Sequence, residues 1–503
     1  ASVHAAWALK DAGLRSVMAN SNPETVSTDF DTSSRLYFEP LDEEAVRDII
    51  ENETYDEPPA SIVQFGGQTA VNLAEPLWRA GLPIIGSSSE AISTAEDRRL
   101  FERFLQERGI PQPPGAAVQS IEEAMKTAET IGYPVLVRPS FVLGGRAMEI
   151  VQNPTELVTY VAQAAEAAPG KPILIDKYLQ GREVEVDAIC DGETVLIPGI
   201  MEHIEQAGVH SGDSMAVYPP VHMDAEEREI ITRYTTEIVL GMGAIGLTNI
   251  QYVLPPREGG SPQVYVIEVN PRASRTVPFL SKVTGVPMVQ LAVSAMLGRK
   301  LRDQGYEGGL WPERNLVAIK APVFSMSKLI GVDTYLGPEM KSTGEVMGID
   351  WTFESALAKT MLAADLALPR DGGVLLSVSD KTKTEALPLI RALAEAGYRL
   401  YATEGTSTMI TALGLPVTTV TKVLSGSHPN VVDVIQDGSV QCVINTPEGR
   451  LTGSLRDGFH IRRAAAEKRI PCFTSMDTAR AAIDALTRNA PYDVATLREY
   501  VNG

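Results

Sequence analysis

The chain has 503 residues, enough for about three domains of ordinary size. Its formal charge is -20, from 44 basic and 64 acidic residues. This argues against a nucleic acid or an acidic membrane as a partner, because both bind basic surfaces. Three widely separated cysteines, Cys190, Cys442 and Cys472, indicate neither a disulfide framework nor a zinc site. No apolar run approaches the roughly 18 residues of a membrane span, so we expect a soluble, cytoplasmic protein.

Residues 1–94 are expected to form an open, mostly parallel α/β sheet. Compact apolar runs at 15–20, 35–38, 61–65 and 82–86 alternate with helical stretches. The loop at 66–69 follows one of these predicted strands, where such sheets bind ligands, although ordinary turn chemistry explains it equally well. The chain opens on a helical pattern without a preceding strand, so we expect it to be a fragment of a longer protein.

A predicted hairpin with strands at 249–254 and 263–270 carries the strongest chemical signal of residues 95–300. Alternation along the second strand points Glu268 and Asn270 to one face, and Gln251 can sit beside them if the register allows. One carboxylate and two amide oxygens suit Mg²⁺, and Arg272 and Arg275 follow at once. Guanidinium groups match phosphate geometry, so this pattern indicates phosphoryl transfer. The alternative is a strand with a solvated acidic face that ends in an Asn-Pro turn.

Weaker candidates for nucleotide binding precede the hairpin. Arg98 lies on a charged helix, for which a solvated helix face is the alternative, and Arg138 ends a predicted strand. The pair Gly144-Gly145 can bring backbone N–H groups close to a triphosphate, or can form only a hairpin turn. The backbone at 177–179 could hydrogen-bond an adenine ring and Glu183 a ribose, although both positions also suit ordinary strand-end charges.

The polar loop at 201–214 contains two histidines, His203 and His210, that lack the spacing of a zinc helix. Ser211 follows His210 directly in sequence, and adjacent residues generally point apart, so a serine hydrolase is disfavoured.

The C-terminal third contains a connection and a second α/β unit. Residues 301–370 form a mixed connecting region, and Pro369 to Gly373 has the composition of a linker. Residues 371–503 restart the α/β alternation with their own core, including helices expected near 384–396 and 478–488. Hydroxyls, a lysine and free N–H groups at the predicted strand ends form a candidate small-anion pocket, with turn residues and a surface lysine as the alternative.

Several long stretches resemble one family. YPVLVRPSFVLGGRA (133–147), VIEVNPRA (266–273), SNPETVSTDFDTS (21–33) and LGPEMKSTGEVMG (336–348) are similar to the C-terminal half of the large subunit of carbamoyl phosphate synthetase, and the resemblance extends along essentially the whole chain. It implies a pre-ATP-grasp domain at 1–94, N-terminally incomplete, an ATP-grasp domain at 95–300, a connecting region at 301–370 and a methylglyoxal-synthase-like allosteric domain at 371–503.

The resemblance also implies an activity. This half would use ATP, with Mg²⁺ or Mn²⁺ and K⁺, to phosphorylate carbamate to carbamoyl phosphate for pyrimidine and arginine synthesis. Its partners would be the N-terminal half of the large subunit, which makes carbamate, and a glutamine amidotransferase small subunit. Nucleotides such as UMP or IMP, and ornithine, would act as effectors.

Site residues carry over by motif. The metal would be held by Gln251, Glu268 and Asn270, with Arg272 and Arg275 facing phosphates or carbamate; these two arginines with Glu268 and Asn270 would be catalytic. The nucleotide would be lined by Arg98, Arg138, Gly144, Gly145, Lys177, Leu179, Glu183, Gly208, Val209, His210 and Ser211, together with Gln251 and Glu268. Nucleotide effectors would bind Lys383, Thr403, Thr406, Lys422 and Asn445, and ornithine would bind Glu205, Asp213, Glu339 and Thr474. Pro447 departs from the pattern, because nucleotide-binding members have a hydroxyl there.

Two other functions compete with this one. A different ATP-grasp ligase, such as a biotin-dependent carboxylase or a purine-pathway ligase, would share the chemistry of Arg138, Glu268 and Asn270 but gives no reason for the last domain. A nucleotide sensor without catalysis would need that domain but not a complete metal site. Methylglyoxal synthase activity is disfavoured, because the last domain has no convincing His and Asp acid-base set.

Overall fold

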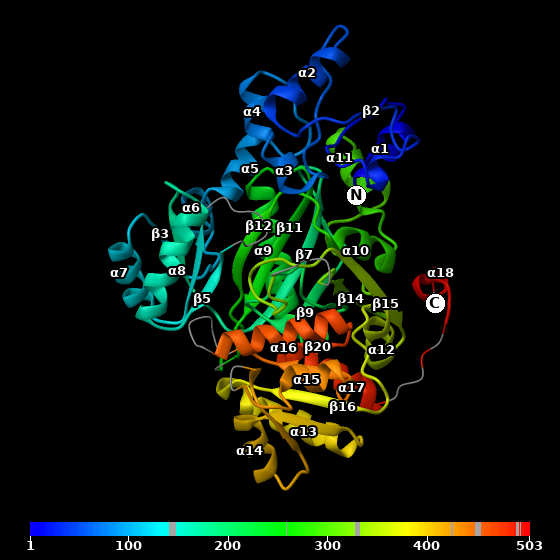
Figure 1. Ribbon diagram of the computed structural model, residues 1–503. Coiled ribbons are helices and arrows are strands. Elements are labelled where there is room, and N and C mark those ends of the chain that lie inside the picture. Colours follow the sequence, from blue (N-terminus) through cyan, green and yellow to red (C-terminus); the bar gives the residue numbers. More distant parts are fainter. Residues whose placement is uncertain are drawn as a thin grey trace.

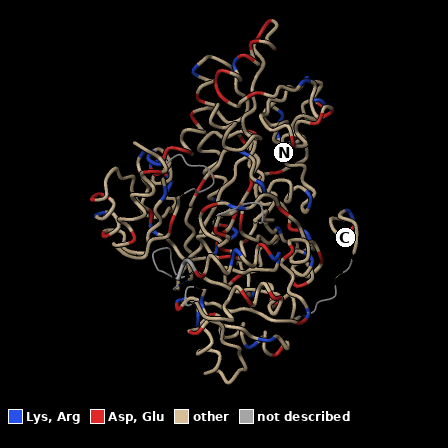
Figure 2. The backbone as a smooth tube through the Cα atoms, viewed as in Figure 1, with Lys and Arg blue, Asp and Glu red and all other residues tan. Residues whose placement is uncertain are grey.

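The computed structural model describes residues 1–139, 147–257, 259–326, 332–423, 426–447, 454–488, 492 and 494–502. The chain runs from an N-terminal α/β unit, through a large central sheet with a smaller sheet beside it, to a C-terminal α/β unit at the opposite end (Figure 1). Acidic and basic residues are interspersed along the tube, so the net charge of -20 is not gathered in one segment (Figure 2). Within the described ranges no single helix could cross a membrane; only the bent pair α10 (Thr276–Thr284) and α11 (Met288–Met296) passes together, by length and composition.

The N-terminal unit has less sheet than its apolar runs predicted. Strands β1 (Val17–Ala19) and β2 (Arg35–Tyr37) pair in parallel, and a single parallel bridge joins Ser61 to Ile84. Pro59 and Pro83 flank the two bridged runs and lack the N–H donors that would extend the ladder. The helices are α1 (Ser2–Asp11), α2 (Glu43–Glu53), α3 (Gly67–Val71), α4 (Ala74–Arg79) and α5 (Ser89–Glu96).

A separate antiparallel sheet of four strands stands beside the central sheet, and we call it the side sheet. Its strand order is β3 (Gly115–Val118), β6 (Ile173–Lys177), β4 (Val135–Pro139) and β5 (Glu149–Val151). Helices α7 (Ile121–Ile131) and α8 (Pro154–Ala167) supply the other half of its apolar core. Helix α6 (Arg98–Glu107) precedes it in the chain.

The central sheet has nine strands and two chemically different faces. On β7 (Arg182–Cys190), Val184, Val186 and Ala188 pack into the core with α9 (Ala225–Gly241), while the alternate residues point the other way. The path continues through β12 (Tyr265–Asn270), β11 (Gly246–Leu254), β7, β9 (Ile200–Gln206), β10 (Ala216–Tyr218), β14 (Val317–Val323) and β15 (Gly344–Asp350), and β8 (Val195–Ile197) and β13 (Gly309–Leu310) lie off it.

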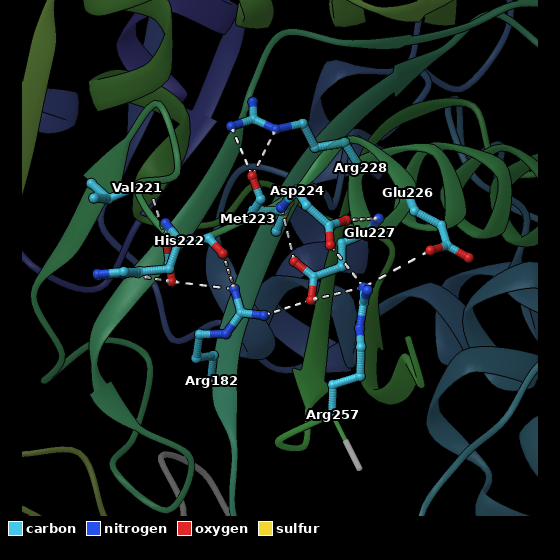
Figure 3. A network of polar contacts seen from close by, with 10 residues as sticks. Arg182, Val221, His222, Met223, Asp224, Glu226, Glu227, Arg228 and Arg257 are labelled. Carbon is cyan, nitrogen blue, oxygen red and sulfur yellow. Dashed lines mark hydrogen bonds and ion pairs between the residues drawn. The ribbon is translucent and has the colours of Figure 1, made fainter. Parts of the chain in front are cut away.

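A network of hydrogen bonds and ion pairs connects the N-terminus of helix α9 to this sheet (Figure 3). Glu202 of β9 accepts hydrogen bonds of 2.8 Å from two backbone N–H groups of the preceding turn, and Arg182 of β7 lies 2.6 Å from Glu227 of α9. Asp224 caps the helix in a capping box with Glu227 and forms an exposed ion pair of 2.8 Å with Arg257.

The region at 301–370, predicted as a mixed connecting region, contributes two strands to the central sheet. Strands β14 and β15 extend the central sheet, and α12 (Phe353–Ala363) packs against them. Two basic residues of this region, Lys320 and Lys341, are buried. A lysine in an apolar strand is buried when its ammonium finds acceptors, which the sequence pattern alone does not show.

The C-terminal unit is a five-stranded parallel sheet. Its order is β18 (Thr418–Val420), β17 (Arg399–Thr403), β16 (Gly373–Ser377), β19 (Cys442–Asn445) and β20 (Cys472–Phe473). Its helices are α13 (Lys383–Glu395), α14 (Glu404–Ala412), α15 (Val431–Gln436), α16 (Ser454–Lys468) and α17 (Met476–Arg488), and α18 (Leu497–Asn502) ends the chain. One apolar cluster contains Ile319 of the central sheet and Val374 of this unit, so the two units share a core.

Candidate active site

The hairpin of β11 and β12 has the register that the alternation required. Gln251 is paired with Glu268, and Asn249 with Asn270. Directly opposed side chains in an antiparallel pair stand about 5 Å apart at Cβ. Glu268 is exposed, whereas Gln251 and Asn270 are half-buried, so one carboxylate and two amides form a rim at the solvent edge of one sheet face.

Both arginines after β12 are held by polar side chains from other parts of the chain. Arg272 donates to Asn270 Oδ1 at 3.0 Å and to Gln68 Oε1 at 3.4 Å; Gln68 lies in helix α3, which occupies most of the loop predicted at 66–69. Arg275 donates to Ser342 Oγ at 3.0 Å. These contacts fix the guanidinium groups beside the hairpin.

Beneath the rim lies a row of buried carboxylates on the polar face of β7. Glu183, Glu185 and Asp187 alternate along this strand, and Glu185 pairs with Gln251 across the sheet. Glu185 Oε1 accepts hydrogen bonds of 2.9 Å from Asn249 and from Thr276. Sequence reasoning found only Glu183 of this row, although carboxylates at every second position of REVEVDAIC are a visible signal.

Burial and neighbouring charges separate these carboxylates in protonation. Burial raises the pKa of Glu183 to about 7, and burial together with the charge of Glu185 raises the pKa of Asp187. Burial alone would also raise the pKa of Glu185, but the hydrogen bond from His203 and the charge of Lys320 outweigh it and lower that pKa. Glu185 is therefore the most readily ionised carboxylate of the row.

The predicted nucleotide arginines share one carboxylate that the sequence analysis missed. Arg98 lies 2.7 Å from Asp176 Oδ1, and Arg138 Nε donates to Asp176 Oδ2 at 3.1 Å. Asp176 is buried on β6, and the Arg98 side chain is 12% exposed, so a solvated helix face is not the environment of Arg98. An acidic residue inside the apolar strand ILIDK is the signal that could have found Asp176.

Other predicted nucleotide residues have mixed outcomes. The ammonium of Lys177 donates to the carbonyls of Gly132 and Tyr133 at 3.0 and 2.9 Å, so its side chain is a structural contact. Leu179 is half-buried just beyond it. Gly144 and Gly145 lie outside the described residues.

The segment 208–211 bends over the polar face. Ser211 Oγ accepts from Gln251 Nε2 at 2.9 Å, and the Ser211 carbonyl accepts from the buried Lys320 at 3.1 Å. Gly208 has φ +112°, and a Cβ there would lie 2.8 Å from a methyl carbon of Ile150 in the side sheet. Only glycine allows this approach. Val209 and His210 are half-buried, and burial lowers the pKa of His210.

The predicted nucleotide-effector residues meet at the carboxyl ends of β16, β17 and β19. Thr403 Oγ1 donates to Ser377 Oγ at 3.4 Å, and Asn445 Nδ2 donates to the Ser377 carbonyl at 3.0 Å. Thr406 Oγ1 accepts from the backbone of the same strand end at 3.1 Å. Lys383 begins α13 nearby, Lys422 follows β18, and Pro447 follows β19.

The predicted ornithine residues lie between the central sheet and the C-terminal unit. Buried Glu205 accepts from Met215 N at 2.8 Å and from Thr478 Oγ1 at 2.6 Å, so it bridges the two units. Asp213 accepts from Lys341 N and Ser342 N at 2.8 and 2.9 Å. Thr474 Oγ1 accepts from Leu336 N at 2.9 Å, and Glu339 lies on the same segment as Leu336.

Comparisons with known proteins agree with this architecture. The family model described as carbamoyl phosphate synthase preATP-grasp domain matches residues 1–94, and the model described as carbamoyl-phosphate synthase L chain, ATP binding domain, matches residues 97–304. An MGS-like domain matches residues 385–474. A carbamoyl phosphate synthase large chain of Thermomicrobium roseum is 60% identical over 96% of this chain, and the chain spans 45% of that relative's length.

Solved structures of lower identity share the fold alone. The biotin carboxylase domain of Hydrogenobacter thermophilus 2-oxoglutarate carboxylase is 21% identical, with a TM-score of 0.58, over 72% of this chain and 87% of its own. N5-carboxyaminoimidazole ribonucleotide synthetase from Thermotoga maritima is 15% identical, with a TM-score of 0.53, over 72% of this chain and 94% of its own.

Proposed function

The chain belongs to the carbamoyl phosphate synthase large-chain family, and from this premise we propose that its central sheet transfers the γ-phosphoryl group of ATP to carbamate, giving carbamoyl phosphate. One observation carries the proposal: Gln251 and Glu268 are paired across β11 and β12, with Arg272 and Arg275 directly after the hairpin. Phosphoryl transfer depends mainly on positioning and on charge stabilisation, and these side chains offer both.

The rim at the hairpin fits a divalent cation such as Mg²⁺ or Mn²⁺. Among the described residues no group of three His, Cys, Asp or Glu side chains could hold a metal, so the ligands would have to include the amides of Gln251 and Asn270 beside Glu268. Asn270 Oδ1 already accepts from Arg272, but an amide oxygen has a second lone pair. A bound cation would neutralise charge on the triphosphate and on the transferred group.

A monovalent cation such as K⁺ is not fitted by the deeper part of the same face. The charge of Lys320 already acts on Glu185 there, and although burial lowers the pKa of His203, Glu183 and Glu185 raise it more strongly, so a further cation would be repelled.

The chain's own residues then have separate tasks. Arg98 and Arg138, fixed on Asp176, would bind the nucleotide between the side sheet and the central sheet. Arg272 and Arg275 would orient the phosphates and the carbamate, whose carboxylate oxygen attacks the γ-phosphorus while the bond to ADP breaks.

The partners of the whole enzyme are also part of this proposal. An amidotransferase small subunit and the other half of the large chain would supply the carbamate. The strand-end pocket of the C-terminal unit would bind a phosphate-bearing effector of the UMP or IMP type, and the Glu205 and Asp213 region would bind an ornithine-type effector.

Formation of ATP from MgADP and carbamoyl phosphate tests the activity without any partner. We expect Glu268→Gln to slow it by about 3 kcal/mol of lost transition-state stabilisation, roughly 100-fold. Glu193→Gln is the matched control, because Glu193 is an exposed side chain at the far end of β7. An unimpaired Glu268→Gln variant would remove Glu268 from the site, and turnover of a different acyl phosphate instead would favour another ATP-grasp ligase.

A further inference from the structure

One buried guanidinium joins the C-terminal pocket to the segment between β14 and β15. Arg462 of α16 is 1% exposed, and its Nε and Nη2 donate to the two carboxylate oxygens of Asp333, both at 2.6 Å. Its remaining arm, Nη1, donates to Asn445 Oδ1 at 2.5 Å. Asn445 is one of the residues assigned above to the effector pocket. Because a guanidinium is a rigid plane, its three contacts cannot move independently.

Asp333 belongs to an interdomain segment, residues 332–342, that lies against both units. The carbonyl of Gly337 accepts from His210 N at 2.8 Å, and Leu336 N donates to Thr474. Two cationic groups lie near the Tyr335 ring. The Arg462 guanidinium is 5.9 Å from the ring centroid, and the Lys341 ammonium is 4.1 Å from it. The segment is therefore tied along its length to side chains of the ATP-binding half and of the C-terminal unit.

The far end of the interdomain segment holds one of the phosphate-facing arginines. Ser342 Oγ donates its single proton to the Gly212 carbonyl at 2.9 Å, which leaves its lone pairs for Arg275 Nη1 at 3.0 Å. Ser342 N is in turn held by Asp213. A shift of this segment would change the acceptor that Arg275 meets.

We infer that Asp333 and Arg462 are a positioning pair, which transmits occupancy of the C-terminal pocket through residues 332–342 to Arg275. An effector that engages Asn445 competes with Arg462 for its side-chain oxygen and reorients the guanidinium. The carboxylate of Asp333 follows, because both of its oxygens are bound to the same plane. This inference rests on the proposed function for the roles of Arg275 and the pocket.

The same interface offers a matched control. Asp477 of α17 accepts from Gln206 N at 3.3 Å, so it also joins the two units. No contact described for it reaches Asn445 or the interdomain segment. Asp477→Asn therefore removes one negative charge from the same interface without changing the contacts of Arg462 or of residues 332–342. Asp333→Asn replaces the carboxylate that accepts both hydrogen bonds from Arg462, and Ser342→Ala removes the hydroxyl that accepts from Arg275.

Two measurements on the full chain test the path, with UMP and IMP as probes. Hydrogen–deuterium exchange follows peptides covering 332–342 with and without nucleotide, and ATP formation gives the KM for MgADP under the same conditions. In the unaltered chain and in Asp477→Asn we expect bound nucleotide to change the exchange of residues 332–342 and the KM for MgADP. In Asp333→Asn we expect nucleotide to bind still, by equilibrium dialysis, while exchange and KM no longer respond, so that the ratio of KM values becomes about 1. Ser342→Ala should keep the exchange response and lose the KM response.

The outcomes separate the two proposals. An Asp333→Asn variant whose exchange and KM respond like those of the unaltered chain overturns the positioning pair, as does an unaltered chain in which neither probe changes exchange at 332–342. If exchange responds as expected but the chain makes no ATP from carbamoyl phosphate, the proposed function fails while the path from the pocket stands.

Discussion

Asp176→Asn is the sharpest test of how the nucleotide arginines are held. The carboxylate receives Arg98 and Arg138 from two different elements, at 2.7 and 3.1 Å, and is itself buried. A hydrogen bond to a charged group contributes about 1.5–3 kcal/mol, and removing one partner of a buried pair costs about 3–5 kcal/mol. The Arg138 side chain is 23% exposed and can be hydrated in the variant. We therefore expect Asp176→Asn to lose about 3 kcal/mol of unfolding free energy, the lower end of the range for a buried pair.

Misplaced arginines should also weaken nucleotide binding. A loss of about 1.4–2.8 kcal/mol of binding free energy raises the KM for MgADP roughly 10- to 100-fold. Thermal unfolding and the KM in ATP formation measure the two effects. Asp224→Asn is the control, because its ion pair with Arg257 is exposed and asparagine also caps helices, so we expect little change in thermal unfolding or in KM. A destabilised Asp176→Asn variant with an unchanged KM would refute a nucleotide role for both arginines.

Three further changes test other parts of the site. Glu183 has a folded-state pKa of about 7 against an ordinary value of 4.5, so its contribution to stability is fully present below pH 4.5 and is lost as pH rises through 7; unfolding midpoints of Glu183→Gln should lack that decline relative to the unaltered chain. Gly208→Ala should lower the unfolding free energy by about 1–3 kcal/mol and raise the KM for MgADP, because the added Cβ would meet Ile150 and alanine disfavours the φ of this position. A normal KM would contradict the placement of residue 208 over the nucleotide. Pro447→Thr restores a hydroxyl beside Asn445 and should tighten UMP or IMP by about 1 kcal/mol, roughly fivefold, in equilibrium dialysis, and unchanged affinity would remove position 447 from the pocket.

The sequence could predict the hairpin because strand alternation and a chemical motif coincide there. The period of two that places Glu268 and Asn270 on one face also fixes which face is buried, so only the register remained open. The helices near 384–396 and 478–488 were predicted for a similar reason, since apolar periodicity and a capping glycine mark α13, and α17 has the same periodicity.

The contacts that hold the site together could not be predicted, because they join residues far apart in sequence. Asp176 meets Arg98 and Arg138 through the pairing of β4 and β6, and Lys320 reaches Ser211 only because β14 joins the central sheet. A single charged residue in an apolar strand signals that a partner exists but does not identify it. The two strands that residues 301–370 add to the central sheet depend on the same kind of long-range pairing, which the prediction of a connecting region does not specify.

The buried polar face raises the question of how an acidic chain can bind an anionic nucleotide. Counted by residue type, β7 places three carboxylates below the rim, which would repel a triphosphate. Burial raises the pKa of Glu183 to about 7 and also raises that of Asp187, so ionisation is concentrated on Glu185, which interacts with Lys320 and His203. For His203, burial lowers the pKa, but Glu183 and Glu185 raise it more strongly. Desolvation of Glu183 and Asp187 thus reduces the repulsion that the residue count suggests, which is how an acidic strand can lie beneath a site for an anionic nucleotide.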